Sequence, residues 1–137
     1  MTENMKLKIV LCLFALLAFN SCKKSDYSNG GQLTVTGKNM LVISVMHHTR
    51  ALPGIRVFLK NNATTFPGTD TTVYNWKTTS DGSGIAVFEN LFESNYFLYA
   101  KGIDEGIGME VIGASPEQIN SGTISNNEVY DTLYVTE

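Results

Sequence analysis

The feature that most constrains this chain is a two-residue alternation of apolar side chains in short segments that turn residues separate. Residues 39–47 show it first, with Leu41, Ile43 and Val45 at every second position. Such alternation is typical of a β-strand, because successive side chains of a strand point to opposite faces. The body of the chain shows no sustained helical period, so the sequence predicts an all-β domain.

Further segments repeat the pattern or are rich in β-branched and aromatic residues. The pairs Pro53-Gly54 and Asp81-Gly82 are turn signals between them. We expect strands at residues 39–47, 55–61, 71–80, 85–91, 95–102, 109–112 and 128–137, with a further one near Thr123. Short strands at this spacing predict a β-sandwich of about seven strands.

The N-terminal segment is typical of an export signal. Two lysines precede residues 9–19, which are almost wholly apolar. This combination indicates a signal peptide, and the run is shorter than the ~20 apolar residues of a membrane-spanning helix. Glu3 is unusual in a positive signal start, so initiation at Met5 is an alternative to initiation at Met1.

Cys22 follows the apolar run in the stretch "FNSC". This stretch resembles the lipobox of bacterial lipoproteins, in the looser form found in Bacteroidetes. The resemblance implies that residues 1–21 are a cleaved lipoprotein signal peptide and that Cys22 carries the lipid. Acyl chains on Cys22 would anchor the protein in the membrane of the cell envelope. We expect the outer membrane, with its periplasmic and surface faces both open as alternatives.

The remaining chain divides into a tether and a domain. Residues 22–36 are expected to be the lipidated cysteine and a flexible tether, because residues 23–32 are polar and contain Gly-Gly. Residues 37–137 are expected to form the β-sandwich. Cys12 lies in the discarded segment, so the mature domain has no thiol and no disulfide. A bridge between Cys12 and Cys22 is the alternative, and it requires that both residues survive processing.

The order of residues within 41–102 points to a particular kind of sandwich. A Pro-Gly turn precedes a short strand, a T-x-D-x-x-G-x-A-x-F-x-x-L segment and a Y-x-L-x-A segment. The matching residues are Pro53, Gly54, Val57, Leu59, Thr79, Asp81, Gly84, Ala86, Phe88, Leu91, Tyr96, Leu98 and Ala100. This order resembles the carboxypeptidase-regulatory-like and collagen-adhesin B-type domains. The resemblance implies a transthyretin-like (prealbumin-like, Ig-like) β-sandwich.

Two groups of residues raise the question of a metal site. His47 and His48 are adjacent, and neighbours on a strand point to opposite faces, so we expect that they do not share an ion. Asp104, Glu105 and Glu110 could gather around calcium, but their spacing matches no EF-hand loop. We therefore expect a solvated loop there, and the sequence predicts no metal and no cofactor.

Aromatic residues are the candidate binding residues. We expect Tyr74 and Trp76 to share one strand face, and Phe97 and Tyr99 to share another. An open face of this kind could stack on a sugar or pack on a protein partner. The alternative is that each face belongs to the core or is covered.

Two short motifs resemble O-glycosylation sites of Bacteroidetes envelope proteins. They are Asp70-Thr71-Thr72 and Asp131-Thr132-Leu133, with Thr71 and Thr132 as the acceptors. Three-residue patterns also arise by chance, and Thr71, near a loop, is the better candidate.

The net charge and the absence of catalytic motifs from the sequence exclude some classes of function. The formal net charge of −3 comes without a clustered basic face, so we expect no nucleic-acid partner. The chain has neither a Gly-x-Ser-x-Gly elbow nor a Cys/His pairing, so we expect no enzyme. We expect a lipid-anchored cell-envelope module that binds an envelope protein or a glycan. The alternatives are a structural subunit of an envelope or fimbrial assembly and, less favoured, a small hydrolase.

Overall fold

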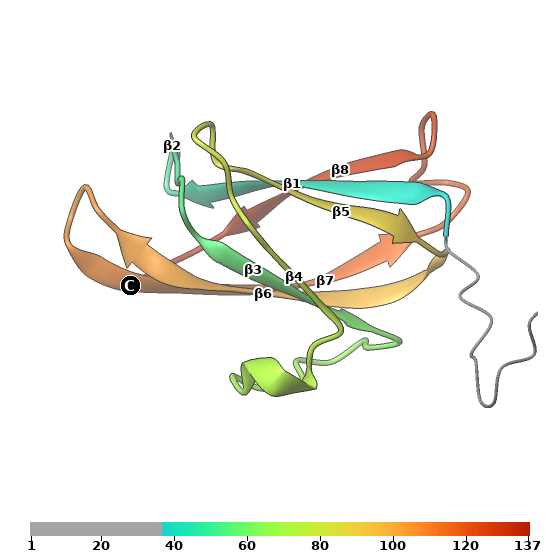
Figure 1. The fold of residues 1–137 in the computed structure, drawn as a ribbon, viewed down its shortest axis with the longest axis horizontal. Helices are drawn as coiled ribbons and strands as arrows, with labels where there is room; N and C mark the ends of the chain where they lie inside the picture. The colour runs from blue at the N-terminus through green and yellow to red at the C-terminus, as the bar shows by residue number, and fades with distance from the viewer. Residues whose placement is uncertain (1–36) are drawn as a thin grey trace, which may run out of the picture. The chain divides into compact units, whose positions relative to one another are not determined.

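The computed structural model describes residues 37–137, so the signal peptide, Cys22 and the tether lie outside the described part. Figure 1 shows two facing layers of strands. The elements are β1 (Asn39–His47), β2 (Arg50–Ala51), β3 (Arg56–Asn61), the 3-10 helix η1 (Thr71–Val73), β4 (Trp76–Thr79), β5 (Ile85–Leu91), β6 (Ser94–Asp104), β7 (Met109–Ile119) and β8 (Glu128–Tyr134). The predicted all-β sandwich is confirmed. Within residues 37–137, no helix has the length and apolarity needed to span a membrane.

β1 is the centre of the first sheet. It pairs antiparallel with β5 on one side and parallel with β8 on the other. On the same side as β5, the short strand β2 pairs with the last two residues of β1. The β1–β8 ladder runs from Met40 opposite Glu128 to Met46 opposite Tyr134. The second sheet has the order β4-β3-β6-β7 and is antiparallel throughout.

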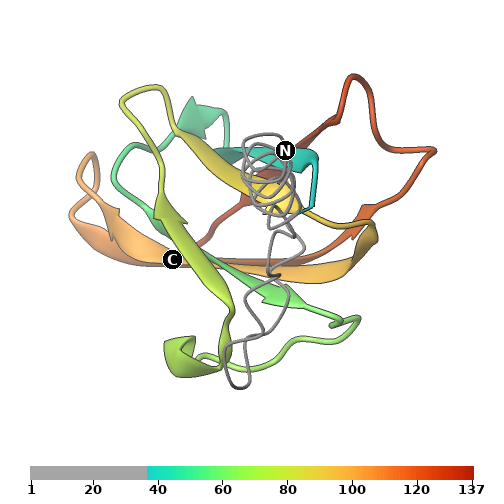
Figure 2. The same cartoon turned by 45° about the vertical axis from the view of Figure 1, so that its right-hand side comes forward.

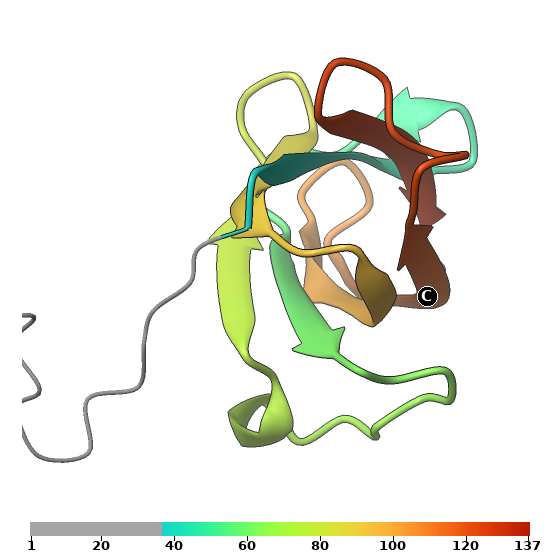
Figure 3. The ribbon, with the colours of Figure 1, turned by 90° about the vertical axis from the view of Figure 1, so that its right-hand side faces the viewer.

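The core lies between the two sheets, as the alternation predicts. Leu41, Ile43 and Val45 of β1 are fully buried. Leu59 of β3 and Leu98 of β6 face them from the second sheet and are equally buried. The end-on view of Figure 3 shows the two layers in section.

Backbone hydrogen bonds close one side of the sandwich. Ile112 of β7 and Thr136, which follows β8, exchange two backbone bonds of 2.8 Å. The turned view of Figure 2 shows β8 and the chain after it crossing from the first sheet toward the second. Pro116 lies in β7 beyond this bridge, and an edge strand tolerates proline because an outward N–H is not needed for pairing.

The predicted tight turn after residue 80 is present. Gly84 has a φ of 79°, a conformation that glycine adopts without strain. A Cβ atom at this position would lie 2.9 Å from the Cβ of Ala51. Gly84 is therefore required both for its backbone conformation and for its missing side chain.

The structure departs from the predicted strands most clearly in three places. The segment 71–80 is a strand only from Trp76, because Asp70 caps η1 by accepting a hydrogen bond from the Thr72 N–H at 2.9 Å. No strand forms at Thr123, whose hydroxyl donates to the Gln118 carbonyl inside a turn. β7 continues to Ile119, seven residues past its predicted end, because β6 pairs with it throughout.

Candidate functional site

The outer face of the second sheet carries a layer of aromatic rings. In β6, Leu98 points into the core, so its neighbours Phe97 and Tyr99 point outward. Phe58 of β3 lies beside Tyr99, with ring centroids 6.1 Å apart. All three outward rings are nevertheless less than a tenth exposed. They must therefore be covered from outside.

The cover is the segment 62–75, between β3 and β4, which lies below the second sheet in Figure 3. The Phe66 ring packs on the Tyr99 ring with centroids 5.7 Å apart. The Tyr74 ring stacks on the same Tyr99 ring with centroids 5.8 Å apart. The Tyr74 hydroxyl donates a hydrogen bond of 2.8 Å to the Gly68 carbonyl. Burial, and then the proximity of Tyr99, raise the pKa of Tyr74 to about 12. The Tyr74 hydroxyl therefore stays protonated, and keeps its role as donor, at alkaline pH where an ordinary tyrosine ionises.

The predicted pairing of aromatic residues is correct for one pair and wrong for the other. Phe97 and Tyr99 share a face, but the covering segment buries it. Tyr74 precedes β4 and joins the outer layer, whereas Trp76 lies in β4 with its ring 6.1 Å from that of the core residue Tyr96. Tyr74 lies between η1 and β4 and is not part of a strand. The alternation of strand side chains therefore does not place it on the same face as Trp76. A binding role for these four residues stays a prediction.

An open aromatic groove adjoins this layer. It has a volume of about 360 Å³, and its wall includes Phe66, Tyr99, Ile112, Tyr134 and Thr136. Phe66 is 46% exposed, Ile112 44% and Tyr134 63%. Large exposed apolar groups that gather in one place mark an interaction surface. We call this surface the aromatic groove.

Sequence reasoning missed the groove because its walls come from three distant elements. Phe66 belongs to the covering segment, Ile112 to β7 and Tyr134 to β8. The local signal was Phe66 itself, a single aromatic residue in the polar loop "NNATTFPGTD". Nothing in the local pattern indicates that Tyr134 lies near it.

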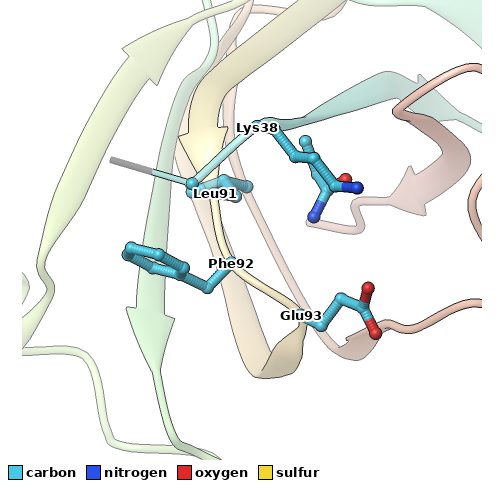
Figure 4. A pocket seen from close by; sticks show the side chains of 6 residues that line it. Lys38, Leu91, Phe92 and Glu93 are labelled. Atoms are coloured by element: carbon cyan, nitrogen blue, oxygen red, sulfur yellow. The ribbon is translucent and has the colours of Figure 1, made fainter. Parts of the chain in front are cut away.

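A second hollow, of about 450 Å³, lies where β1 begins (Figure 4). Lys38, Leu91, Phe92 and Glu93 line it. The lysine and the glutamate offer opposite charges, so the hollow presents no net charge that would select a ligand. The aromatic groove is the better candidate for binding.

The two predicted glycosylation acceptors have different surroundings. Thr71 is exposed in η1, while Thr132 is half-buried in β8. Asp70, beside Thr71, accepts hydrogen bonds from the hydroxyl and the backbone N–H of Thr72, which lower the pKa of the Asp70 carboxyl. Thr71 is thus the accessible acceptor, and its modification stays a prediction.

The structure corrects the expectation for the two histidines. His48 lies in the turn after β1 with a φ of 54°, so the strand alternation does not apply to it. Its ring centroid lies 4.4 Å from that of His47. The two imidazoles are therefore neighbours and do not face opposite sides of the sheet.

The three acidic residues do not gather around one point. Asp104 is 1% exposed, which corrects the expected solvated loop at this residue, and its carboxylate contacts His47 and Arg50. Glu110 pairs instead with Lys101 at 3.1 Å. Burial acts to raise the pKa of Asp104, but hydrogen bonds from His47, Arg50 and the Gly106 N–H outweigh it and hold that pKa below its usual value. Asp104 is therefore a charged, buried acceptor.

Comparison with known proteins identifies the fold and no family. The sequence matches no family model and no curated protein. The structure is similar to the pilus 2b backbone protein of group B streptococcus, with a TM-score of 0.51, 19% identity and 72% of this chain covered. It is also similar to the major pilin SpaD of Corynebacterium diphtheriae, with a TM-score of 0.50, 19% identity and 73% of this chain covered.

These likenesses concern one part of each pilin. The chain spans 40% of the length of the streptococcal protein and 30% of the length of the corynebacterial one. At this identity the comparison establishes a shared β-sandwich fold.

Proposed function

We propose that this chain is a lipoprotein of the cell envelope whose β-sandwich is a non-catalytic structural subunit of a surface assembly. Cys22, in its Bacteroidetes-type lipobox, holds it to the outer membrane through lipid. The aromatic groove is its contact with a neighbouring protein. The likeness of the fold to parts of a pilus backbone protein and of a major pilin supports the structural role.

The observation that carries this proposal is the exposure of the aromatic groove. Phe66, Ile112 and Tyr134 each leave more than two fifths of their surface open. Burial of such apolar surface contributes about 25 cal/mol per Å², which favours a protein partner with a matching apolar segment. The groove also lies beside the bridge between Ile112 and Thr136, so the fold fixes its shape.

A second candidate function is the capture of a glycan in the same groove. The exposed rings of Phe66 and Tyr134 lie in its wall. Aromatic rings of this kind offer apolar faces to sugar rings, and a tyrosine hydroxyl adds a polar contact.

A site-specific photo-crosslinker distinguishes the two functions. It replaces Tyr134 in the full chain, in the cells that make it. A matched control places it at Glu89, exposed on β5, which flanks the opposite side of β1 in the same sheet. A ladder of multiples of the chain's own mass, absent from the control, supports the structural subunit. A single adduct with another protein supports an accessory module. If position 134 gives no adduct while glycans bind the purified chain, the structural role is wrong.

The anchor is tested separately by metabolic labelling with a fatty-acid analogue. Wild type should take the label, and Cys22→Ala should lose it. Surface protease on intact cells then distinguishes the two faces of the outer membrane. An unlabelled wild type would contradict the lipoprotein assignment and leave the groove proposal standing.

A further inference from the structure

Three metal-ligating side chains meet at one end of the molecule. They belong to His47, at the end of β1, His48, in the turn after it, and Glu137, beyond β8. One potential ligand atom from each lies within 4.8 Å of the other two. The parallel ladder causes this proximity, since β8 runs beside β1 and the Val135 N–H donates to the Met46 carbonyl at 2.9 Å.

A contact between His47 and Asp104 fixes the orientation of the His47 ring. Its Nδ1 lies 2.9 Å from an Asp104 carboxylate oxygen. Asp104 is held in turn by Arg50 and by the Gly106 N–H at 2.9 Å. An ionised carboxylate can only accept, so Nδ1 carries the proton of this bond. In the neutral imidazole, the lone pair then lies on Nε2.

That lone pair points at a second acceptor. His47 Nε2 lies 2.8 Å from a Glu137 carboxylate oxygen. His47 is only 5% exposed, and within residues 37–137 its Nε2 makes no hydrogen bond of good geometry. Two acceptors this close repel each other unless a cation lies between them. The cation is either a proton on Nε2 or a metal ion.

His48 favours the metal ion. A proton on Nε2 would need only Glu137 as its partner, whereas a metal ion uses three or more donors. The His48 ring lies against the His47 ring, with planes 30° apart, and its side chain is exposed and can turn toward the site. Two imidazoles and one carboxylate form a ligand set that Zn²⁺ accepts.

We propose that His47, His48 and Glu137 bind one divalent transition-metal ion, with Zn²⁺ as its representative. Asp104 is a positioning residue that fixes the tautomer of His47, as a carboxylate behind a ligating histidine does. Water completes the coordination on the exposed side. This site is separate from the aromatic groove and does not depend on its function.

The geometry requires only a small adjustment. Zinc–nitrogen and zinc–oxygen bonds of about 2.0–2.2 Å at tetrahedral angles separate two ligand atoms by roughly 3.3 Å. His47 Nε2 and the Glu137 oxygen must therefore move apart from 2.8 Å. Glu137 can do so, since its side chain is 48% exposed.

The bound ion would act as a clamp. It would join the hairpin of β1 and β2 to the residues after β8, which also bridge to β7 at Ile112. An ion that binds the folded state and not the unfolded chain raises the melting temperature with its concentration.

The experiment titrates Zn²⁺ into the full-length chain, purified in detergent and stripped with chelator, by calorimetry. We expect one ion per chain and a rise in melting temperature of several degrees at saturation, reversed by EDTA. His48→Ala should weaken binding by at least about tenfold, and its stabilisation by Zn²⁺ is compared with its own metal-free melting temperature. Thr49→Ala, in the same turn, is the matched control and should bind as wild type does.

Two further variants keep the test decisive. Glu137→Gln should also weaken Zn²⁺ binding, and the rise in its melting temperature with Zn²⁺ is compared with its own metal-free value. Asp104→Asn should reduce affinity by about 10–100-fold if the chain still folds. The proposal is overturned if wild type binds no Zn²⁺, in which case His47 and Glu137 form an ion pair around a proton. It is equally overturned if His48→Ala binds Zn²⁺ as tightly as wild type.

Discussion

The ring of Tyr74 stacks on the ring of Tyr99, with centroids 5.8 Å apart and planes 26° from parallel. This contact joins the covering segment to the outer face of the second sheet. The second sheet therefore has apolar contacts on both faces, the core on one side and the segment 62–75 on the other. The covering segment should unfold together with the sandwich.

Replacement of Tyr74 tests that cooperative contact. Tyr74→Ala removes the stacked ring, and we expect a loss of about 2 kcal/mol in the free energy of unfolding, because the site is only partly buried. Tyr74→Phe keeps the ring, loses the bond to Gly68 and should cost about 1 kcal/mol. Urea denaturation measures both. Val73→Ala, exposed in η1, is the control, and equal effects at positions 73 and 74 would contradict the role of the stack.

A pair of glycines in one turn offers a second test. Gly84→Ala forces a φ of 79° on alanine and places its Cβ 2.9 Å from that of Ala51. We expect a loss of about 2 kcal/mol in the free energy of unfolding. Gly82→Ala should be nearly neutral, since a Cβ there has no neighbour within 4 Å. If the two variants have the same denaturation midpoint, the geometry of this turn is wrong.

Glu117 should make stability depend on pH. Burial, together with a hydrogen bond and charge from Asp131, raises the pKa of Glu117 from 4.5 to about 7. A carboxyl group with a higher pKa in the folded state binds more protons when the chain is folded. Stability should therefore fall as the pH rises from about 4.5 to about 7. We expect a fall of about 1 kcal/mol, since solvent screens a half-buried group.

Glu117→Gln is the variant that isolates this effect. It carries no charge at any pH, so it should be more stable than wild type at pH 8 and lose the decline between pH 5 and pH 8. Melting temperatures across this range measure the difference. Glu89→Gln, exposed on β5, should keep the wild-type profile. A decline that persists in Glu117→Gln would assign the titration to another group.

Glycosylation of Thr71 is expected to appear as added mass. The intact chain, isolated from the cells that make it, should exceed its sequence mass after the lipid is accounted for. Thr71→Ala should remove one glycan mass, while Thr72→Ala, which keeps the acceptor, should retain it. Mass spectrometry decides, and an added mass that survives Thr71→Ala excludes this acceptor.

The strands could be predicted where apolar residues alternate locally. The strands at residues 39–47 and 85–91 could be predicted without tertiary information, because each has one apolar face that must be buried in a core. The rest of β7 carries the segment "GASPEQ", which has little strand propensity. Pairing with β6 fixes this segment as a strand, and pairing is not visible in its own sequence.

The candidate sites were harder to predict because the residues that form them lie far apart in the sequence. His47 and Asp104 are separated by 57 positions, and no local pattern joins them. The rule of opposite faces failed for His48 because β1 ends at His47 and His48 already has a left-handed backbone, to which the rule does not apply. Phe97 and Tyr99 were placed correctly on one face, but the segment that covers them lies more than twenty residues away.

The relative direction of the first and last strands of the domain has a mechanical consequence. β1 and β8 are parallel and paired over seven positions, and the chain enters β1 at Asn39 and leaves β8 at Tyr134, at opposite ends of the pair. Tension between these two points therefore shears the strands along each other. All the backbone bonds between them share the load at once, so the domain cannot be unzipped one bond at a time. A chain connected in this way transmits force through its own central strand.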